Sequence, residues 1–344
     1  MPFVNDILQH RSLAIVGLDK NTGKTVCLNY LLHRLNELGV STAVTSIGVD
    51  GEQTDAVFAT AKPEITLYEG MTFITSEQHY RRRQLLTEIL SVDEHRTSLG
   101  RLVTARALTC GKVLLSGAAT TERLRSEIQE FDSMGVRLSI VDGALSRLSL
   151  ASPTVTDAMI LATGAAVSPN LKILISKTKY TCKLINLPEV EPELKNRLNI
   201  IESGLWGIDS DGEAHNLEIP SVFMLGDKTE ALFRYGTSLF VSGAVSDRLL
   251  KLLAAQPNID FITLIARDFT KLFITQEVFA DYTRRGGQLK VLQQSRLMAV
   301  CLNPTSPKGY RLNSHEACAA LSDALQMPVY DVMQPDSLKV ENIH

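Results

Sequence analysis

The amino-acid sequence predicts an α/β fold, in which helices pack on a mostly parallel sheet. Short apolar runs alternate along the chain with segments in which apolar residues recur at helical spacing. Strands that are buried on both faces of a parallel sheet are typically near-continuous apolar runs of this kind. The chain has 344 residues, of which 44% are hydrophobic and 21% charged, so it is long enough and apolar enough for two domains.

The expected elements follow in order from the amino end. Strands are expected at the short apolar runs 13–16, 41–47, 112–116, 137–141, 158–162, 237–241, 261–265, 289–292 and 297–301, and residues 328–332 close the pattern. Helices are expected at 26–35, 78–90, 100–108, 122–134, 170–187, 193–198, 247–255, 275–284 and 314–325. Ser314 is expected to cap the last helix, and a hairpin is expected at 205–212.

The strongest functional motif is the segment GLDKNTGKT from Gly17 to Thr25, between the first strand and the first helix. In this context a glycine-containing loop presents backbone N–H groups and a helix N-terminus to the phosphates of a nucleotide. We therefore expect ATP to be bound by Gly17, Asp19, Lys20, Asn21, Thr22, Gly23, Lys24 and Thr25. Lys24 would contact the β- and γ-phosphates, and the Thr25 hydroxyl would bind Mg²⁺.

The spacing of this loop is unusual. Five residues separate Gly17 from Gly23, whereas the common phosphate-binding loop has about four residues between its glycines. A chance Gly-Lys-Thr at a strand–helix junction is the alternative interpretation. The place of the loop after the first strand, and the charged residues Asp19 and Lys20, favour a nucleotide site.

Three acidic residues lie at the ends of predicted strands. Asp50 and Glu52 follow the second strand, and Asp142 follows the strand at 137–141. Ligands of parallel sheets bind beyond the carboxyl ends of the strands, and Mg²⁺ prefers oxygen ligands. The expected ligands of Mg²⁺, direct or through water, are Thr25, Asp50, Glu52 and Asp142. The expected catalytic residues are Lys24, Asp50 and Asp142. The alternative is that each acid only caps a turn, since Asp-Gly is common in turns.

Composition argues against several classes of partner. The net charge is −3, and Arg81, Arg82 and Arg83 would spread around a helix, so no basic patch for nucleic acid is expected. No apolar run is long enough to span a membrane, and the first residues do not form a secretory signal. The five cysteines are scattered without a Cys-x-x-Cys pair. We therefore expect a cytoplasmic protein with reduced thiols.

Together these observations predict two domains. Residues 1–165 would form a P-loop nucleotide-binding domain, with the parallel sheet of a P-loop NTPase and helices on both faces. Residues 166–220 would form a connector with a helix and a hairpin, residues 221–335 a second, smaller α/β domain, and residues 336–344 a C-terminal tail. The second domain contains no second phosphate-binding loop of the same kind.

The first domain resembles dethiobiotin synthetase and its relatives, whose loop reads Gly-Thr-Asp-Thr-x-x-Gly-Lys-Thr. The residues that match this pattern are Gly17, Asp19, Gly23, Lys24 and Thr25, and those that depart from it are Leu18 and Lys20. The segment from Val141 to Ala144 is also similar. The Lys-Pro that follows the second strand in that family is replaced here by residues 46–51, which argues against biotin chemistry.

Over its whole length the chain resembles the P-loop subunits of lysine 5,6-aminomutase reactivases. The resemblance rests on segments 17–25, 45–52, 141–163 and 303–310, on similar length and on a second α/β half. It implies an ATP-binding subunit that lets an adenosylcobalamin-dependent lysine aminomutase of lysine fermentation exchange damaged cobalamin for intact cofactor. It also implies a MutS-like companion subunit and the aminomutase as partners, and it leaves a homo-oligomer open.

Three functions are consistent with these features. The first is an ATPase that acts with a partner as a reactivase. The second is an ATP-dependent ligase or amidase that activates a carboxylate, related to dethiobiotin synthetase. The third is a nucleotide-binding regulator that barely hydrolyses ATP. The sequence offers no clear cluster for a substrate carboxylate beyond the loop, which favours the first function over the second.

Overall fold

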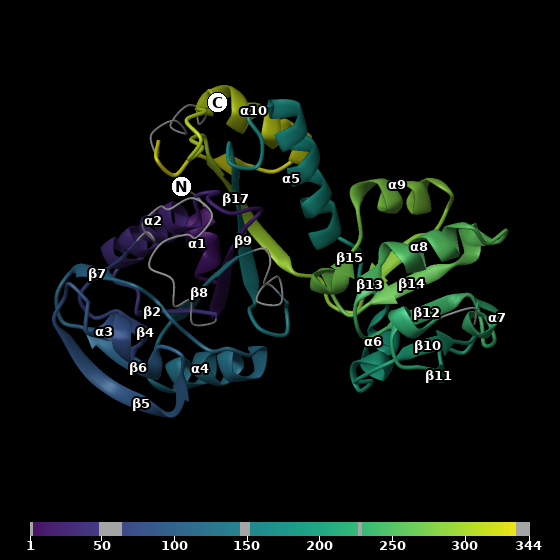
Figure 1. Ribbon diagram of the computed structural model, residues 1–344, viewed down its shortest axis with the longest axis horizontal. Coiled ribbons are helices and arrows are strands. Elements are labelled where there is room, and N and C mark those ends of the chain that lie inside the picture. The colour runs from purple at the N-terminus through teal and green to yellow at the C-terminus, as the bar shows by residue number, and fades with distance from the viewer. Residues whose placement is uncertain (1–2, 48–63, 145–151, 226–228, 335–344) are drawn as a thin grey trace. The chain divides into compact units, whose positions relative to one another are not determined.

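The computed structural model describes residues 3–47, 64–144, 152–225 and 229–334, and it divides into two compact units (Figure 1). Unit 1 comprises Met1–Lys179 and Leu297–His344, and unit 2 comprises Tyr180–Arg296. Both units combine helices with β-sheets, so the fold class is mixed α/β. Within the described ranges, no helix has the length and apolar character needed to cross a membrane.

Unit 1 contains a nine-stranded sheet in the order β18-β17-β9-β1-β8-β2-β4-β6-β5. Its strands are β1 (Ser12–Gly17), β2 (Thr42–Ser46), β4 (Thr72–Ser76), β5 (Thr87–Thr97), β6 (Gly100–Ala107), β8 (Leu138–Ala144), β9 (Ala158–Gly164), β17 (Arg296–Asn303) and β18 (Val329–Tyr330). β1 is parallel to β8 and β9, and β2 is parallel to β8 and β4. β6 is antiparallel to β4 and β5. The sheet is therefore mixed, whereas the sequence predicts a parallel one.

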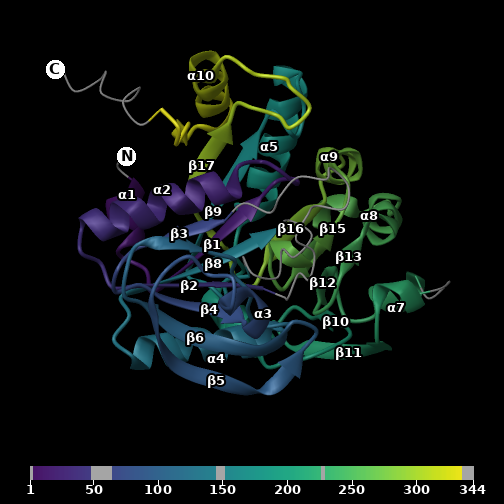
Figure 2. The ribbon, with the colours of Figure 1, turned by 60° about the vertical axis from the view of Figure 1, so that its left-hand side comes forward.

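Helices pack on both faces of this sheet (Figure 2). The helices of unit 1 are α1 (Phe3–Ile7), α2 (Lys24–Glu37), α3 (Glu77–Tyr80), α4 (Thr121–Ser133), α10 (Ser314–Leu325) and the first part of α5 (Leu171–Ile185). Ile15 on β1 and Ile140 on β8 share a buried cluster with Leu28 on α2. The next residue of β8, Val141, points to the opposite face and shares a cluster with Leu124 on α4.

The hairpin β5–β6 replaces the two helices that the sequence predicts at 78–90 and 100–108. Of the helix predicted at 78–90, only the short helix α3 forms. Ser76 caps α3 by accepting a hydrogen bond from the His79 N–H. On β6, Leu102 packs on the α4 side of the sheet and Val103 on the α2 side. A strand with apolar residues on both faces can have the same apolar spacing as a helix, so the sequence pattern alone does not distinguish the two. In the structure, pairing with β4 and β5 makes this segment a strand. Two further short strands, β3 (Ile65–Leu67) and β7 (Gly111–Val113), pair antiparallel.

Unit 2 is the smaller α/β unit, built on a five-stranded sheet in the order β11-β10-β12-β14-β16. Its main strands are β10 (Leu205–Ile208), β11 (Ala214–Ile219), β12 (Ser238–Val241), β14 (Thr263–Ala266) and β16 (Gln288–Val291), and a separate pair is β13 (Val245–Ser246) with β15 (Leu272–Phe273). Its helices are α6 (Pro192–Asn199), α7 (Thr229–Leu232), α8 (Asp247–Ala254) and α9 (Gln276–Arg284), with 3-10 turns η2 (Val222–Met224), η3 (Ile259–Phe261) and η4 (Phe269–Lys271). β12, β14 and β16 are parallel, and β10 is antiparallel to β11 and β12.

The two units differ from the predicted division of the chain in two respects. Residues 180–220, predicted as part of a connector, belong to unit 2, because the hairpin β10–β11 supplies two strands of its sheet. The C-terminal elements β17, α10 and β18, predicted within the second domain, belong to unit 1. β17 is a neighbour of β9 in the large sheet, and Ala299 and Cys301 lie in the same core cluster as Ile15. Unit 2 is therefore an insertion that begins within α5, at Tyr180, and ends at Arg296, the first residue of β17.

The N-cap of the last helix lies one residue earlier than the sequence predicts. Asn313, not Ser314, is the N-cap of α10, and its side-chain oxygen accepts a hydrogen bond from the Glu316 N–H at 3.2 Å. Ser314 is the first helical residue, and its hydroxyl donates to Asp331 Oδ2 at 2.5 Å. Asparagine and serine are both good caps, so the carboxylate of Asp331 accounts for the different role of Ser314.

Candidate functional site

The segment from Gly17 to Gly23 joins β1 to α2 in one tight bend. β1 ends at Gly17, and α2 follows Gly23, whose φ of 90° lies in the left-handed region that favours glycine. Asn21 is also left-handed, with a φ of 60°, a conformation that asparagine tolerates. The N–H of Leu18 donates to the Ala162 carbonyl at 2.8 Å and so fixes the start of the bend to β9.

The inside of the bend is held by hydrogen bonds within the loop. The Thr22 hydroxyl donates to the Asp19 carbonyl at 2.9 Å, and Asp19 Oδ1 accepts from the Lys20 N–H at 2.7 Å. A Cβ on Gly17 would lie 2.5 Å from Thr22 Oγ1 and 2.9 Å from Lys24 Cγ. Gly17 therefore leaves room for the aliphatic stem of Lys24 to fold back over the end of β1, which explains the glycine at this position.

The N-terminus of α2 is suited to an anion. Its N-cap is Gly23, which has no side chain to accept a hydrogen bond from the first turn. The first intrahelical bond runs from the Cys27 N–H to the Gly23 carbonyl, at 3.0 Å. The N–H groups of Lys24, Thr25 and Val26 precede it and have no partner within the helix. Together with the helix dipole, these three donors favour a negative charge beside Lys24.

Lys24 and Asp142, which the sequence predicts as site residues, meet at the carboxyl edge of the sheet. Lys24 Nζ lies 3.7 Å from Asp142 Oδ1, and both side chains are 21% exposed. Asp142 is on β8, paired in register with Ile15 of β1, so it lies beside the strand that leads into the bend. The sheet therefore brings a cation and a carboxylate together at the start of α2.

The donor set around Asp142 is compatible with Mg²⁺. Asp142 Oδ1 is buried and accepts no hydrogen bond from the part of the chain that the structure describes. The Lys24 ammonium, 3.7 Å away, balances the charge of this oxygen but lies beyond hydrogen-bond distance, so the oxygen can still bind a metal ion or an ordered water. Thr25 lies in the first turn of α2, and Mg²⁺ is commonly bound by one or two protein oxygens together with substrate phosphates. No group of three or more His, Cys, Asp or Glu side chains forms a metal site by itself among the described residues.

Two of the predicted metal ligands, Asp50 and Glu52, lie outside the described residues. The strand that precedes them, β2, ends at Ser46, which pairs in register with Asp142. The Ser46 hydroxyl donates to the Asp142 carbonyl at 3.2 Å. The end of β2 is thus attached to the strand that carries the carboxylate of the candidate site.

Asn303 contacts the bend, although the sequence gives it no such role. It is the last residue of β17, and its side-chain Nδ2 donates to the Asn21 carbonyl at 3.5 Å. A Cβ on Gly23 would lie 2.7 Å from the Cβ of Asn303, so only glycine allows this approach. An asparagine at the carboxyl end of an apolar strand, followed by Pro304, is the signal in the sequence that could have identified it.

Beside this contact there is a small hollow of about 10 Å³, which has room for roughly one water molecule and is partly open to solvent. The bend and the start of α2 line it on one side, and β17 and the segment after β18 line it on the other. Its lining includes Thr22, Gly23, Val26, Asn303, Val332 and Met333. Apolar walls with one side-chain amide are typical of small-molecule sites.

A buried carboxyl group, Glu127, lies behind the same edge of the sheet. Glu127 is on α4 and is 2% exposed, and its Oε2 accepts a hydrogen bond from the Thr45 hydroxyl at 3.2 Å. Burial raises the pKa of Glu127 to about 7, although Thr45, Arg123 and the Ala118 N–H each lower it. The sequence does not single out this residue, because a glutamate in an amphipathic helix usually faces solvent.

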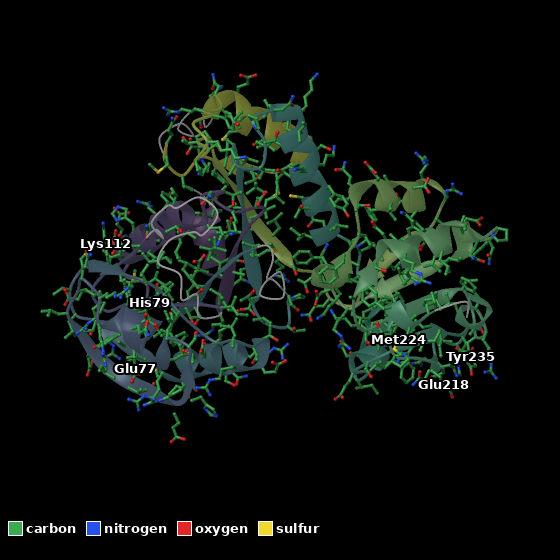
Figure 3. The ribbon with its side chains drawn as sticks, in the orientation of Figure 1. Glu77, His79, Lys112, Glu218, Met224 and Tyr235 are labelled. Carbon is green, nitrogen blue, oxygen red and sulfur yellow. The ribbon has the colours of Figure 1, made fainter. Side chains whose placement is uncertain are left out.

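A buried serine–histidine pair lies further along the edge, where β4 ends. His79 on α3, which is labelled in Figure 3, is 3% exposed. Its Nδ1 lies 2.9 Å from Ser116 Oγ. Next to Ser116, a Cβ on Gly117 would lie 1.8 Å from the Ser46 carbonyl oxygen. The segment 116–118 therefore packs directly against the end of β2, and polar groups extend along the edge from Lys24 to His79.

No protein-family model matches the chain, and no curated protein matches it either. Neither comparison assigns the bend, Asp142 or the hollow to a known family. The function is therefore inferred from the chemistry of the residues themselves.

Glu127 should make stability depend on pH. The unfolded chain releases this proton near pH 4.5 and the folded chain near pH 7, so the folded state binds more protons between these values. The favourable contribution is complete below about pH 4.5 and is lost as pH rises through about 7, by at most about 3 kcal/mol. Glu127→Gln should remove this part of the pH dependence, as measured by urea unfolding between about pH 4.5 and 8.

The control is Asp132→Asn, which changes an exposed carboxylate of the same helix that does not act on Glu127 and should leave the pH dependence intact. If the unfolding free energies of Glu127→Gln and the unchanged protein fall in parallel with pH, Glu127 does not titrate as described.

Proposed function

We propose that this chain binds ATP with Mg²⁺ at the bend between β1 and α2 and hydrolyses it. The observation that supports the proposal best is the pair of Lys24 Nζ and Asp142 Oδ1, 3.7 Å apart beside the N-terminus of α2. A cation, a carboxylate and unpaired helix N–H groups at the end of a parallel strand are what a triphosphate and its metal require. Under this proposal the nine-stranded sheet is that of a P-loop NTPase.

Each residue of the bend then has a defined role. The N–H groups of the first turn of α2 bind phosphate oxygens, and the Lys24 ammonium contacts the β- and γ-phosphates while its stem stays over Gly17. The Thr25 hydroxyl and the Asp142 carboxylate would hold Mg²⁺, which when bound neutralises charge on the phosphates. Asp142 is suited to this role because its Oδ1 accepts no hydrogen bond from any described residue.

The protein surface around the small hollow beside the bend is the proposed place for the nucleobase. Val26 and Val332 offer apolar contact to a flat ring, and Met333, which is 68% exposed, could pack over it. Asn303 uses one amide N–H for the Asn21 carbonyl and one lone pair of its Oδ1 for the Thr305 N–H. Its second N–H and second lone pair are left for the edge of a base.

The biological role that we propose is that of a reactivase subunit, acting with a MutS-like companion subunit on an adenosylcobalamin-dependent lysine aminomutase. The resemblance of segments 17–25, 141–163 and 303–310 supports this role, and two of these segments meet where Asn303 contacts the bend. Five free cysteines are compatible with the cytoplasmic location that such a role requires. For hydrolysis to change the contact with the aminomutase, the ATP-bound and ADP-bound forms of this chain must bind the aminomutase with different affinities.

A carboxylate-activating ligase is the second candidate. The observation that favours it is the row of polar groups from Ser46 to His79 along the edge, beside the proposed phosphate site. An acceptor substrate would need such groups next to the γ-phosphate. The burial of His79 and Ser116 argues against direct contact with a substrate, so the reactivase role is preferred.

Lys24→Ala should weaken the binding of ATP by about tenfold or more, because charged hydrogen bonds to the phosphates contribute roughly 1.5–3 kcal/mol. Isothermal titration calorimetry with Mg²⁺ and ATP measures this directly. The matched control is Lys112→Ala, which removes an exposed lysine of β7 that pairs with Glu64. An affinity that Lys24→Ala leaves unchanged would exclude the bend as the phosphate site.

Thr25→Ala and Asp142→Asn should each raise the Mg²⁺ concentration needed for half-maximal ATP hydrolysis, because each removes an oxygen ligand of the metal. A titration of activity with Mg²⁺ at a fixed ATP concentration tests this. Thr121→Ala, at the start of α4, removes a hydroxyl in a comparable helical position and should have no effect. If Thr25→Ala and Asp142→Asn need the same Mg²⁺ concentration as Thr121→Ala and the unchanged protein, the metal binds elsewhere.

ATP hydrolysis should be stimulated by lysine aminomutase that contains damaged cobalamin, and Lys24→Ala should abolish the stimulation. Phosphate release is the measurement, with and without the MutS-like companion subunit. Stimulation by small carboxylic acids instead of the aminomutase would support the ligase. Tight binding of ATP without turnover in any of these mixtures would favour a nucleotide-binding regulator.

A further inference from the structure

Glu127 connects two segments of unit 1 near the candidate phosphate site, the end of β2 and residues 116–118 before α4. It lies on α4, and its Oε2 accepts the hydrogen bond from the Thr45 hydroxyl, one residue before the end of β2. The Ala118 N–H, from the segment that precedes α4, also stabilises the charged form of its carboxyl group. Glu127 therefore contacts both the end of β2 and the chain that packs against it.

A series of contacts connects Glu127 with the strand that carries the carboxylate of the proposed metal site. Ser46 follows Thr45, and its hydroxyl donates to the Asp142 carbonyl at 3.2 Å. Gly117 precedes Ala118 and lies so close to Ser46 that a Cβ would come within 1.8 Å of the Ser46 carbonyl oxygen. A shift of α4 relative to β2 would therefore move Ser46, and with it the strand that carries Asp142.

The surroundings of Glu127 do not stabilise a charge fully. Glu127 is 2% exposed on a helix whose Leu124 and Ile128 share a buried apolar cluster with Val141 of β8. The charged groups that act on it are Arg123 and Glu130, both on α4, while β2 contributes Thr45 and the segment before α4 contributes the Ala118 N–H. Arg123 also pairs with Asp93 Oδ2 at 2.8 Å, so its charge is shared with another carboxylate.

We propose that Glu127 is a positioning residue whose protonation is coupled to nucleotide binding at the bend. This inference rests on the proposed function, because it concerns the same nucleotide site. The neutral carboxyl group stays buried and keeps α4 against Thr45 and Ala118. The charged group gains energy if water reaches it, which requires α4 to move away from β2 and loosens Ser46 beside Asp142.

The direction of the effect follows from linkage. We assign nucleotide binding to the form in which α4 is packed against β2. Binding then favours the protonated Glu127 and raises the pKa of its carboxyl group. By reciprocity, protonation of Glu127 strengthens nucleotide binding. Affinity for ATP should therefore fall as pH rises through about 7, and each unit by which the nucleotide raises the pKa corresponds to about a tenfold change in affinity.

The experiment measures ATP affinity by calorimetry between about pH 6 and 8.5 at saturating Mg²⁺, for the unchanged protein, Glu127→Gln and Asp132→Asn. The phosphates of ATP titrate equally in all three proteins, so the difference between their profiles isolates Glu127. Glu127→Gln should keep the high affinity of low pH across the range, because glutamine is neutral and still accepts from Thr45. Asp132→Asn, at an exposed position of α4, should follow the unchanged protein.

A second variant, Thr45→Val, keeps the side-chain shape and removes the donor that favours the charged form. It should move the midpoint of the pH profile to higher pH. A direct readout is the ¹³C resonance of the Glu127 carboxyl carbon, assigned by its loss in Glu127→Gln. Its titration midpoint should rise when a non-hydrolysable ATP analogue is added.

The outcomes separate the two proposals. If the unchanged protein binds no ATP at any pH, the proposed nucleotide function fails and this inference fails with it. If ATP binds, but Glu127→Gln has the same pH profile as the unchanged protein and the nucleotide does not move the carboxyl titration, only the role of Glu127 is overturned. If Glu127→Gln unfolds, the Thr45→Val profile and the ¹³C titration decide the question.

Discussion

The candidate site depends on one steric constraint, the close packing of Thr22 and Lys24 against Gly17. Because Gly17 has no side chain, the Thr22 hydroxyl and the stem of Lys24 can pack against the end of β1. This contact fixes where α2 begins, and the start of α2 sets the position of the Lys24 ammonium beside Asp142. A larger residue at position 17 would displace Thr22 and Lys24 together, so the cation, the helix N–H groups and the carboxylate form one unit.

The parts of this arrangement that the sequence predicts are those that depend on neighbouring residues. β1, the bend and α2 follow one another directly, and the apolar run before Asp142 forms β8 as expected. The hairpin β5–β6 could not be predicted in the same way, since Leu102 and Val103 pack on opposite faces and their spacing also suits a helix. The place of β17 was missed because its pairing with β9 spans the whole of unit 2.

The residues that sequence reasoning missed in the site are defined by tertiary contacts. Asn303 is more than 270 residues away from Asn21 along the chain, and its approach to Gly23 leaves no local pattern except a polar residue at a strand end. Glu127 lies on a helix whose sequence alternates charged and apolar residues, so its burial appears only when Thr45 is placed opposite it. In both cases the missing information is which strands are neighbours in the sheet.

The position of unit 2 in the chain gives the proposed reactivase a physical route for coupling. Unit 2 begins within α5 and ends at the first residue of β17, so its two covalent connections both enter unit 1. β17 starts at Arg296, where unit 2 ends, and finishes at Asn303, whose side chain touches the bend at Asn21 and Gly23. A change of the bend between nucleotide states would act on Asn303. A nucleotide signal that reaches unit 2 through the chain has two covalent routes, α5 and β17, and β17 ends at a residue that contacts the bend. The part of the signal that uses β17 would be lost if the contact between Asn303 and Gly23 were broken while ATP binding was retained.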